Sequence, residues 1–236
     1  MQLSKLENHA YEELKKNNLT IFRIIDLCRI ININKLKAYN LIKSLKEKRA
    51  IDKVGNGYYA FKGSDEYAIA TRIHWPAYIS FWSALNYYGF SDQNPKKIYI
   101  ATTKFKKNTI NFHFVTISKK RFFGYKQAGE LVIAEKEKAI IDSLLFPRYS
   151  GGIKEIEKAI EASKTEININ KLIDYSLKIG SKVVVRRLGY LLEKRGYKNK
   201  KINELNKKIG KGYERLDPSL TKKNNLNSRW LVDINY

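Results

Sequence analysis

The chain is poor in the residue types that hold small secreted or metal-based scaffolds together. Its 236 residues include one cysteine, four prolines and three histidines. A single cysteine, Cys28, cannot form a disulfide within the chain, which excludes a disulfide-scaffolded secreted fold. The histidines stand far apart and lack a metal-ligand spacing such as His-Glu-x-x-His, so we expect no metal centre.

Long apolar segments are also missing. Residues 1–16 contain no apolar stretch of the kind found in signal peptides. No run approaches the roughly 18 uninterrupted apolar residues of a membrane span. The sequence therefore predicts a cytoplasmic protein that does not contact membranes.

Acidic residues are scarce relative to basic ones. Lys and Arg number 46 against 23 Asp and Glu, for a formal charge of +23. Such a charge favours a polyanionic partner, most commonly nucleic acid, because each neutralised phosphate releases counterions. The alternative is a protein from a high-salt or hot cell whose lysines serve only solvation. An apolar content of 43% excludes a disordered polycation.

The first 63 residues read as one unit of three helices and a hairpin. Apolar residues at spacings of three and four over residues 3–17 predict the first helix. Thr20 is the expected N-cap of the second helix, and Asn34 that of a third that ends near Lys48. The second helix would bury one face formed by Ile21, Ile24, Ile25 and Cys28. The third would bury Ala38, Leu41, Ile42 and Leu45.

Two short apolar runs follow the third helix. Residues 50–54 and 58–61 flank Gly55-Asn56-Gly57, a spacing typical of a β-hairpin. Three helices followed by a hairpin is the order of a winged helix-turn-helix, in which the third helix enters the major groove and the hairpin lies along the backbone. A small helical domain that binds protein is the alternative.

Residues 62–66 are polar and predict a joint between a domain at 1–63 and one at 64–236. In the second, Pro76 is the expected start of a helix that runs to Tyr88. Strands are predicted at 97–103 and 109–118, with a turn at 105–108, and at 131–134. Further helices are expected at 135–146, 153–163, 170–178, 183–195 and 200–209, and a strand at 230–234 that returns to the sheet. The fold class is therefore α+β, an N-terminal winged helix-turn-helix followed by a mixed α/β domain with a small sheet and several helices.

The segment from Gln93 to Gly129 has no acidic residue and a local charge of +9. Its lysines lie near strand ends, where they suit contact with phosphates. Its aromatic residues are expected to alternate into the core, although stacking on unpaired bases is the alternative.

Chemistry-bearing motifs are few. No P-loop or dinucleotide-binding glycine motif occurs, so no cofactor is expected, and Cys28 is interpreted as a packing thiol. Glu135, Lys138 and Asp142 fall on one helical face, where ordinary ion pairs are the expected outcome. The same carboxylates could instead serve a metal-dependent nuclease. Arg186 and Arg187 would pair with this helix or meet phosphate.

Several short motifs follow one another in the order seen in a known protein family. They are Tyr78-Ile79-Ser80, Ala84-Leu85, Tyr88-Gly89, Ile98 to Thr102, Ile133-Ala134, Glu137-Lys138-Ala139 with Asp142, Arg187-Leu188-Gly189, and Arg229-Trp230 near Asn235. In order and spacing, over nearly the whole chain, they resemble the AbiEi family of antitoxin-type transcriptional regulators from phage-defence operons.

The resemblance implies a winged helix-turn-helix that binds inverted repeats in its own promoter and represses the operon. It also implies that the part after residue 64 neutralises a nucleotidyltransferase toxin, with direct contact left open. The expected function is thus a non-enzymatic DNA-binding repressor and antitoxin. A nuclease of a defence system and a helix-turn-helix protein-interaction module are the alternatives, and the oligomeric state is open.

Candidate DNA-contacting residues follow from the predicted helix, hairpin and basic segment. They are Lys35, Tyr39, Asn40, Lys43, Lys46, Lys53, Asn56, Tyr58, Lys104, Lys106 and Lys107. Asn40 is suited to bidentate contact with adenine on a base edge. Lys46, Lys53, Asn56 and Tyr58 would touch phosphates or the minor groove. The last three lysines would extend the footprint. No catalytic or metal-binding residue is expected.

Overall fold

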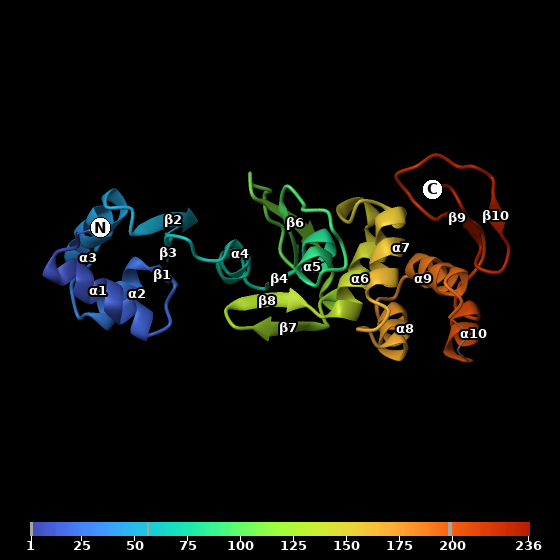
Figure 1. Cartoon of the computed structure of the whole chain (residues 1–236), viewed down its shortest axis with the longest axis horizontal. Helices are drawn as coiled ribbons and strands as arrows, with labels where there is room; N and C mark the ends of the chain where they lie inside the picture. Colours follow the sequence, from blue (N-terminus) through green and yellow to red (C-terminus); the bar gives the residue numbers. More distant parts are fainter. Residues whose placement is uncertain (1, 56, 198–199) are drawn as a thin grey trace. The chain divides into compact units, whose positions relative to one another are not determined.

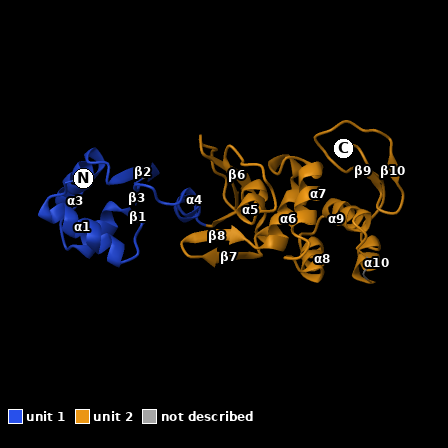
Figure 2. Cartoon of the chain, in the orientation of Figure 1, with its two compact units in different colours: residues 1–75 blue, residues 76–236 orange. Residues whose placement is uncertain are grey.

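The chain forms two compact units, residues 1–75 and 76–236 (Figure 2). The computed structural model describes residues 2–55, 57–197 and 200–236. Both units mix helices with small sheets, which places the protein in the α+β class. No helix in these ranges is long and apolar enough to cross a membrane.

Unit 1 packs helices against a three-stranded antiparallel sheet (Figure 1). Its elements are α1 (Lys5–Lys16), β1 (Ile21–Arg23), α2 (Ile24–Ile30), α3 (Lys35–Glu47), β2 (Ile51–Gly55), β3 (Tyr58–Phe61) and α4 (Glu66–Ile73). The sheet order is β1-β3-β2. The α3 side chains predicted to be buried, Ala38, Leu41, Ile42 and Leu45, all lie in the core.

Local hydrogen bonds define where these helices begin. The backbone N–H of Ser4 donates to the Glu7 carboxylate and that of Glu7 to the Ser4 hydroxyl, a capping box that starts α1. The amide oxygen of Asn34 accepts from the Lys37 N–H at 2.9 Å and starts α3, as predicted.

The start of the second helix was predicted wrongly. Thr20 does not cap it, because Ile21–Arg23 forms β1 and pairs with β3. The helix begins only after Arg23, whose N–H donates to the Asp26 carboxylate at 2.8 Å. Ile25, expected to be buried, is exposed. Phe22 pairs across the sheet with Tyr59, which is distant in sequence, and this strand pairing outweighs the local helix signal.

Helix α4 belongs to unit 1, although the sequence placed a boundary at residue 63. Asp65 caps α4 by accepting from the Tyr67 N–H at 2.9 Å. The Ile73 side chain packs so closely over Gly55 that a Cβ there would lie 3.2 Å from it. Contact with the end of β2 thus extends the unit to Trp75.

Unit 2 is built on a five-stranded mixed sheet. Its strands are β4 (Ala77–Ile79), β5 (Ile98–Thr102), β6 (Phe112–Thr116), β7 (Tyr125–Ala128) and β8 (Leu131–Ala134), in the order β6-β5-β4-β8-β7. β5 pairs with β6, and β4 with β8, in parallel; the other two pairs are antiparallel. The connection from β5 to β6 is therefore a loop between parallel strands rather than the tight turn that the sequence suggested.

The helices of unit 2 gather around α6. They are α5 (Phe81–Tyr87), α6 (Lys136–Leu145), α7 (Ile153–Ala162), α8 (Ile169–Lys178), α9 (Lys182–Lys194) and α10 (Lys200–Asn206), with 3-10 turns η1 (Lys119–Arg121) and η2 (Pro147–Tyr149). α6 contacts α5, α7, α8 and α9 and is buried along nearly its whole length. The positions predicted for α6 to α9 are confirmed to within two residues.

Two other predictions in unit 2 were wrong. Pro76 does not begin a helix: β4 follows it, and α5 starts at Phe81 because β4 is held between β5 and β8. The strand expected at 230–234 is β11 (Val232–Asp233), and it does not return to the large sheet. It lies instead between β10 (Leu226–Asn227) and β9 (Glu214–Arg215) in a separate small sheet.

Candidate nucleic-acid interface

The outward face of α3 is polar, basic and open to solvent. Lys35, Asn40, Lys43 and Lys46 are all exposed, and Tyr39 has 56% of its surface accessible. The opposite face is fixed in the core of unit 1. The sequence-predicted residues of this helix therefore share one surface, with a rigid body behind it.

The start of α3 carries an excess of positive charge. Its first turn contains Lys35 and Lys37 and no acidic residue, whereas α1, α2 and α4 each carry an acidic residue there. A helix N-terminus bears partial positive charge, so these lysines add to a field that carboxylates usually offset. The arrangement favours an external anion at this end of the helix.

Glu7 anchors the C-terminal end of α3 to α1. Its carboxylate accepts from Lys48 Nζ at 2.6 Å and from the Ser44 hydroxyl. These bonds, with the Ser4 backbone N–H, lower the pKa of the nearly buried Glu7 from 4.5 to about 2. Sequence reasoning missed this residue, although its capping-box position, three residues after Ser4, was a usable signal.

The hairpin adds two of the predicted residues to unit 1. Lys53 on β2 is exposed, while Tyr58 on β3 is half-buried and lies 5.7 Å beneath the guanidinium of Arg23. Asn56, also predicted to contact DNA, lies outside the described residues. Arg23 was not predicted and adds a cation beside the hairpin.

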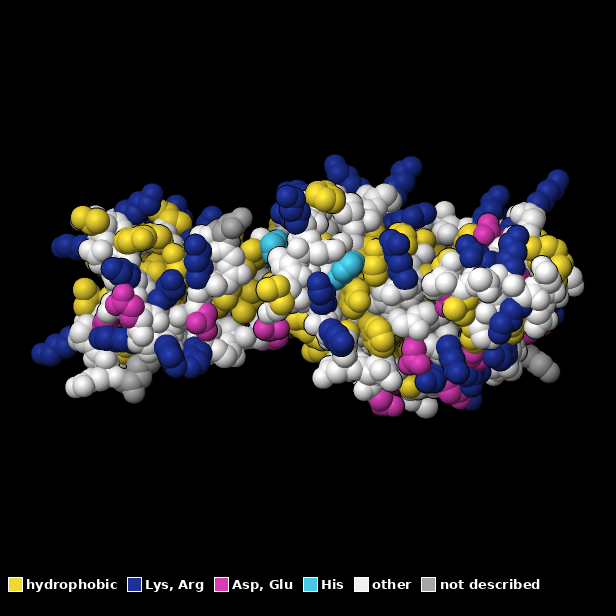
Figure 3. Space-filling view, turned by 90° about the horizontal axis from the view of Figure 1, so that it is seen from above, with side chains coloured by type: hydrophobic (Ala, Val, Ile, Leu, Met, Phe, Trp, Pro, Cys, Tyr) yellow, Lys and Arg dark blue, Asp and Glu magenta, His cyan; other side chains and the backbone are white. Residues whose placement is uncertain are grey.

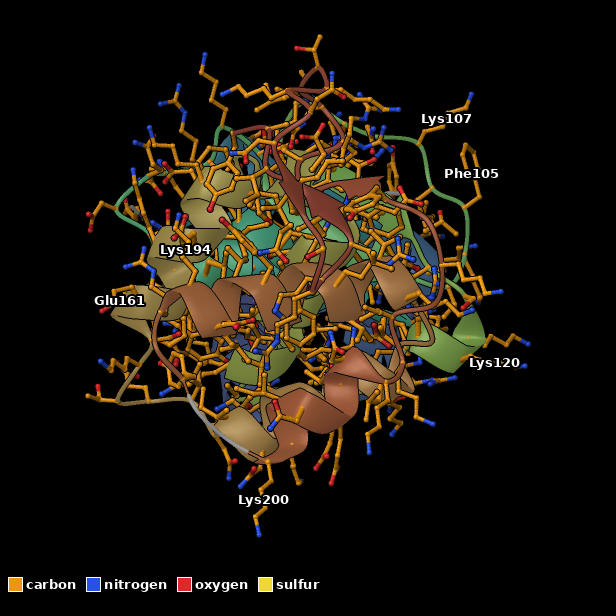
Figure 4. All side chains as sticks on the ribbon, turned by 90° about the vertical axis from the view of Figure 1, so that its right-hand side faces the viewer. Phe105, Lys107, Lys120, Glu161, Lys194 and Lys200 are labelled. Atoms are coloured by element: carbon orange, nitrogen blue, oxygen red, sulfur yellow. The ribbon has the colours of Figure 1, made fainter. Side chains whose placement is uncertain are left out.

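The other three predicted lysines lie in unit 2, in the loop between β5 and β6. Lys104 and Lys107 are exposed and Lys106 is partly exposed. Phe105 and Ile110 in the same loop are 81% and 87% exposed. Figure 4 shows Phe105 and Lys107 pointing out from the loop. The expectation that the segment's aromatics enter the core holds for Phe112 and Phe114 and fails for Phe105.

The loop folds back along the outer edge of β6. The Asn108 side-chain oxygen accepts from the Phe114 N–H at 2.8 Å. Thr109 exchanges two bonds with Phe112: its hydroxyl accepts from the Phe112 N–H at 3.0 Å and its own N–H donates to the Phe112 carbonyl at 2.9 Å. These bonds hold the base of the loop while its tip stays exposed.

The Lys138–Asp142 pair of α6 is internal. Lys138 and Asp142 form an ion pair with both side chains fully buried, and Asp142 also accepts from the hydroxyls of Tyr78 (3.0 Å) and Ser80 (2.8 Å). Burial lowers the pKa of Lys138, and its partner Asp142 opposes that shift. Glu135 departs from the predicted helix pairing, since it binds Lys171 at 3.3 Å and the Tyr175 hydroxyl.

Arg186 and Arg187 of α9 are also internal. Arg186 donates to the carbonyls of Ile209 and Lys211, each at 2.8 Å. Arg187 donates to the carbonyl of Leu144, at the end of α6, at 2.7 Å. Within the described ranges, no cluster of three or more His, Cys, Asp or Glu residues could hold a metal ion.

The fold is similar to the crystal structure of the RV2827C protein from Mycobacterium tuberculosis. The match has a TM-score of 0.72 at 14% sequence identity and covers 98% of this chain and 92% of that one. At this identity the likeness shows the fold alone. No family model matches the chain, and no curated protein matches it in sequence.

Proposed function

We propose that the protein is a non-enzymatic transcriptional regulator that binds duplex DNA through unit 1 and acts as an antitoxin. In this proposal α1 to α3 with the β2–β3 hairpin form a winged helix-turn-helix, and α3 is the recognition helix. The AbiEi resemblance supplies the antitoxin role, the nucleotidyltransferase toxin as functional partner and inverted repeats in the promoter as target.

The exposed basic face of α3 carries the proposal. Asn40 lies on that face, and its amide has the donor–acceptor pair that recognises adenine in the major groove. Lys35, Lys43 and Lys46 on the same helix would bind phosphates and fix its register. An exposed helix face with this composition favours binding to a polyanion, because each phosphate that a lysine neutralises releases counterions.

The surface charge of both units supports the same partner. Figure 3 shows Lys and Arg side chains spread over the viewed face of each unit, with fewer acidic ones among them. Lys104, Lys106 and Lys107 of the β5–β6 loop would supply a further contact with the phosphate backbone of the DNA. A nuclease centred on α6 has less support, because Asp142 is fully buried and already paired with Lys138.

Asn40→Ala tests the assignment of base recognition. We expect binding to the protein's own promoter to weaken by about 1–3 kcal/mol and base preference to relax at one position. Gel-shift titrations against promoter duplexes with single base changes measure both. Asn8→Ala, at an exposed position of α1, is the matched control. Unchanged affinity and preference in Asn40→Ala would contradict the role of α3.

The antitoxin role needs a separate assay. We expect a nucleotidyltransferase gene beside that of this chain. The chain, expressed from an unrelated promoter, should restore growth to cells that express that nucleotidyltransferase. Asn40→Ala should restore growth equally, because neutralisation is assigned to the part after residue 64. Absence of rescue by the parent chain would remove the antitoxin role and leave DNA binding untouched.

A further inference from the structure

A hollow of about 630 Å³ opens on unit 2 where four segments meet. It is lined by Arg121 of η1, by η2 with the end of α6, by the first turns of α9 and, further along the chain, by Glu214, Pro218 and Ser219. Its charged lining residues are Arg121, Arg148, Arg187 and Glu214. Three guanidinium groups against one carboxylate give the walls a net charge of +2.

Arg187 is the most deeply placed of these cations. It is only 5% exposed, and its Nη atoms donate to the carbonyls of Leu144 at 2.7 Å and Arg215 at 3.5 Å. Within the described ranges its Nε has no hydrogen-bond partner and no carboxylate forms an ion pair with it. Burial lowers its pKa to about 10, and Asp217 and Glu214 offset only part of that shift. Arg187 is thus a buried cation without a directly bound counterion.

The other two arginines also lack a carboxylate partner among the described residues. Arg121 donates from Nε to the carbonyl of Ile179 at 3.1 Å. Arg148 donates from Nη2 to the Tyr149 hydroxyl at 2.7 Å and lies over that ring. Each keeps further N–H groups beyond these bonds, and a guanidinium presents five in a planar fork that matches phosphate oxygens.

The N-terminus of α9 adds to this positive field. Ser181 caps the helix and lines the hollow, and the first turn contains Lys182 and no acidic residue. The thirteen-residue helix therefore points the positive end of its dipole at the same space. Phe146, Pro147 and Pro218 give the hollow apolar walls beside the charged ones.

We propose that this hollow binds a phosphate monoester of about the size of a nucleoside monophosphate. A phosphate monoester carries close to two negative charges at neutral pH, which offset the excess of positive charge in the lining. The volume falls in the range of about 300–1,000 Å³ typical of small-ligand sites and exceeds what inorganic phosphate fills. The apolar walls suit the organic part of the ligand. The site is distinct from the DNA-binding face in unit 1 and does not depend on it.

Calorimetric titration of the full chain with AMP, adenosine and inorganic phosphate tests the site. We expect AMP to bind, adenosine not to bind, and phosphate to bind more weakly than AMP. Arg148→Gln and Arg121→Gln should each weaken AMP binding at least about tenfold, the value of one charge-assisted hydrogen bond. Both side chains are partly or fully exposed, so the fold should tolerate the changes.

Lys120→Gln is the matched control, since Lys120 is an exposed cation of η1 outside the lining (Figure 4). An equal loss in Lys120→Gln would reduce the effect to general charge and overturn the proposal. Equal binding of adenosine and AMP, or no binding of AMP, would overturn it too. Displacement of AMP by a duplex without terminal phosphates would instead assign the hollow to the DNA backbone.

Discussion

At the residue scale, the side chain that holds the proposed recognition helix is a carboxylate. Glu7 joins α1 to the last turns of α3 through Ser44 and Lys48. The ion pair is largely shielded on the Glu7 side and more exposed at Lys48. Because Lys48 is committed to Glu7, it is a structural cation, in contrast to the exposed lysines on the outer face of α3.

The stability of unit 1 should therefore fall in acid. An unfolded Glu7 titrates near 4.5 and the folded one near 2, so its contribution is fully present above pH 4.5 and is lost as pH falls towards 2. Hydrogen exchange of α1 and α3 amides, corrected for intrinsic rates, should show faster opening across this window. In Glu7→Gln, the α1 and α3 amides should exchange faster at neutral pH, and their exchange should change less with pH. Glu47→Gln, at an exposed position of α3, is the control and should behave like the parent chain. An unchanged pH profile in Glu7→Gln would contradict this role.

Individual residues also mark what the sequence could and could not predict. The buried face of α3 and its cap at Asn34 follow from periodicity and local hydrogen bonding. The exposure of Phe105 does not, because an aromatic residue is usually buried and only the path of the β5–β6 loop places it outside. The burial of Arg187 beside the hollow was likewise not predictable, because it depends on three segments that are distant in sequence and pack around this side chain.

At the element scale, helices with strong periodicity were predictable, as were the short strands β3 and β8, whereas β1 and β4 were not. Helices α6 to α9 each bury a continuous face and lie where the pattern predicts. β1 and β4 have three residues each and take their hydrogen bonds from segments far along the chain. No local pattern encodes such partners, so both strands were read as parts of helices.

The packing of α9 explains two of the short sequence motifs. Gly189 faces Trp230, and a Cβ at this glycine would lie 2.0 to 2.3 Å from three ring atoms of the indole. The Trp230 ring is completely buried against the helix. The two motifs that contain Gly189 and Trp230 are therefore one contact between α9 and the C-terminal segment.

Gly189→Ala should destabilise unit 2, although alanine is the better helix former by about 1 kcal/mol. The added methyl must displace the indole, and overpacking of this kind typically costs about 1–3 kcal/mol. Urea unfolding followed by tryptophan fluorescence measures the change. In a chain that already carries Trp230→Leu, Gly189→Ala should lower the free energy of unfolding by less than it does in the parent chain, because the indole is absent. A Gly189→Ala variant as stable as the parent chain would refute the contact.

At the scale of the whole molecule, the charge of +23 is carried by two units of similar α+β character. The composition predicts a polyanionic partner. The boundary between the units differs from the predicted joint, because α4 packs on the hairpin through a contact that no composition shift marks.

Under the proposed function, the salt dependence of binding should identify which lysines bind DNA phosphates. Lys43→Ala should lower the slope of log affinity against log salt by about one and weaken binding to all sequences alike. Lys158→Ala, which removes a lysine already paired with Glu155 at 2.8 Å, changes net charge equally and serves as the control. Filter-binding titrations across a salt series measure the slopes. Equal slopes for the two variants would show that net charge alone sets the affinity.

The loop between β5 and β6 protects the protein from aggregation at high concentration. β6 is the outer strand of its sheet, and its amides at Phe112 and Phe114 already bond to Thr109 and Asn108. An outer strand with occupied amides is a poor template for the strand of a neighbouring molecule. Trimming the loop to aid crystallisation would uncover that template and invite fibrous precipitation.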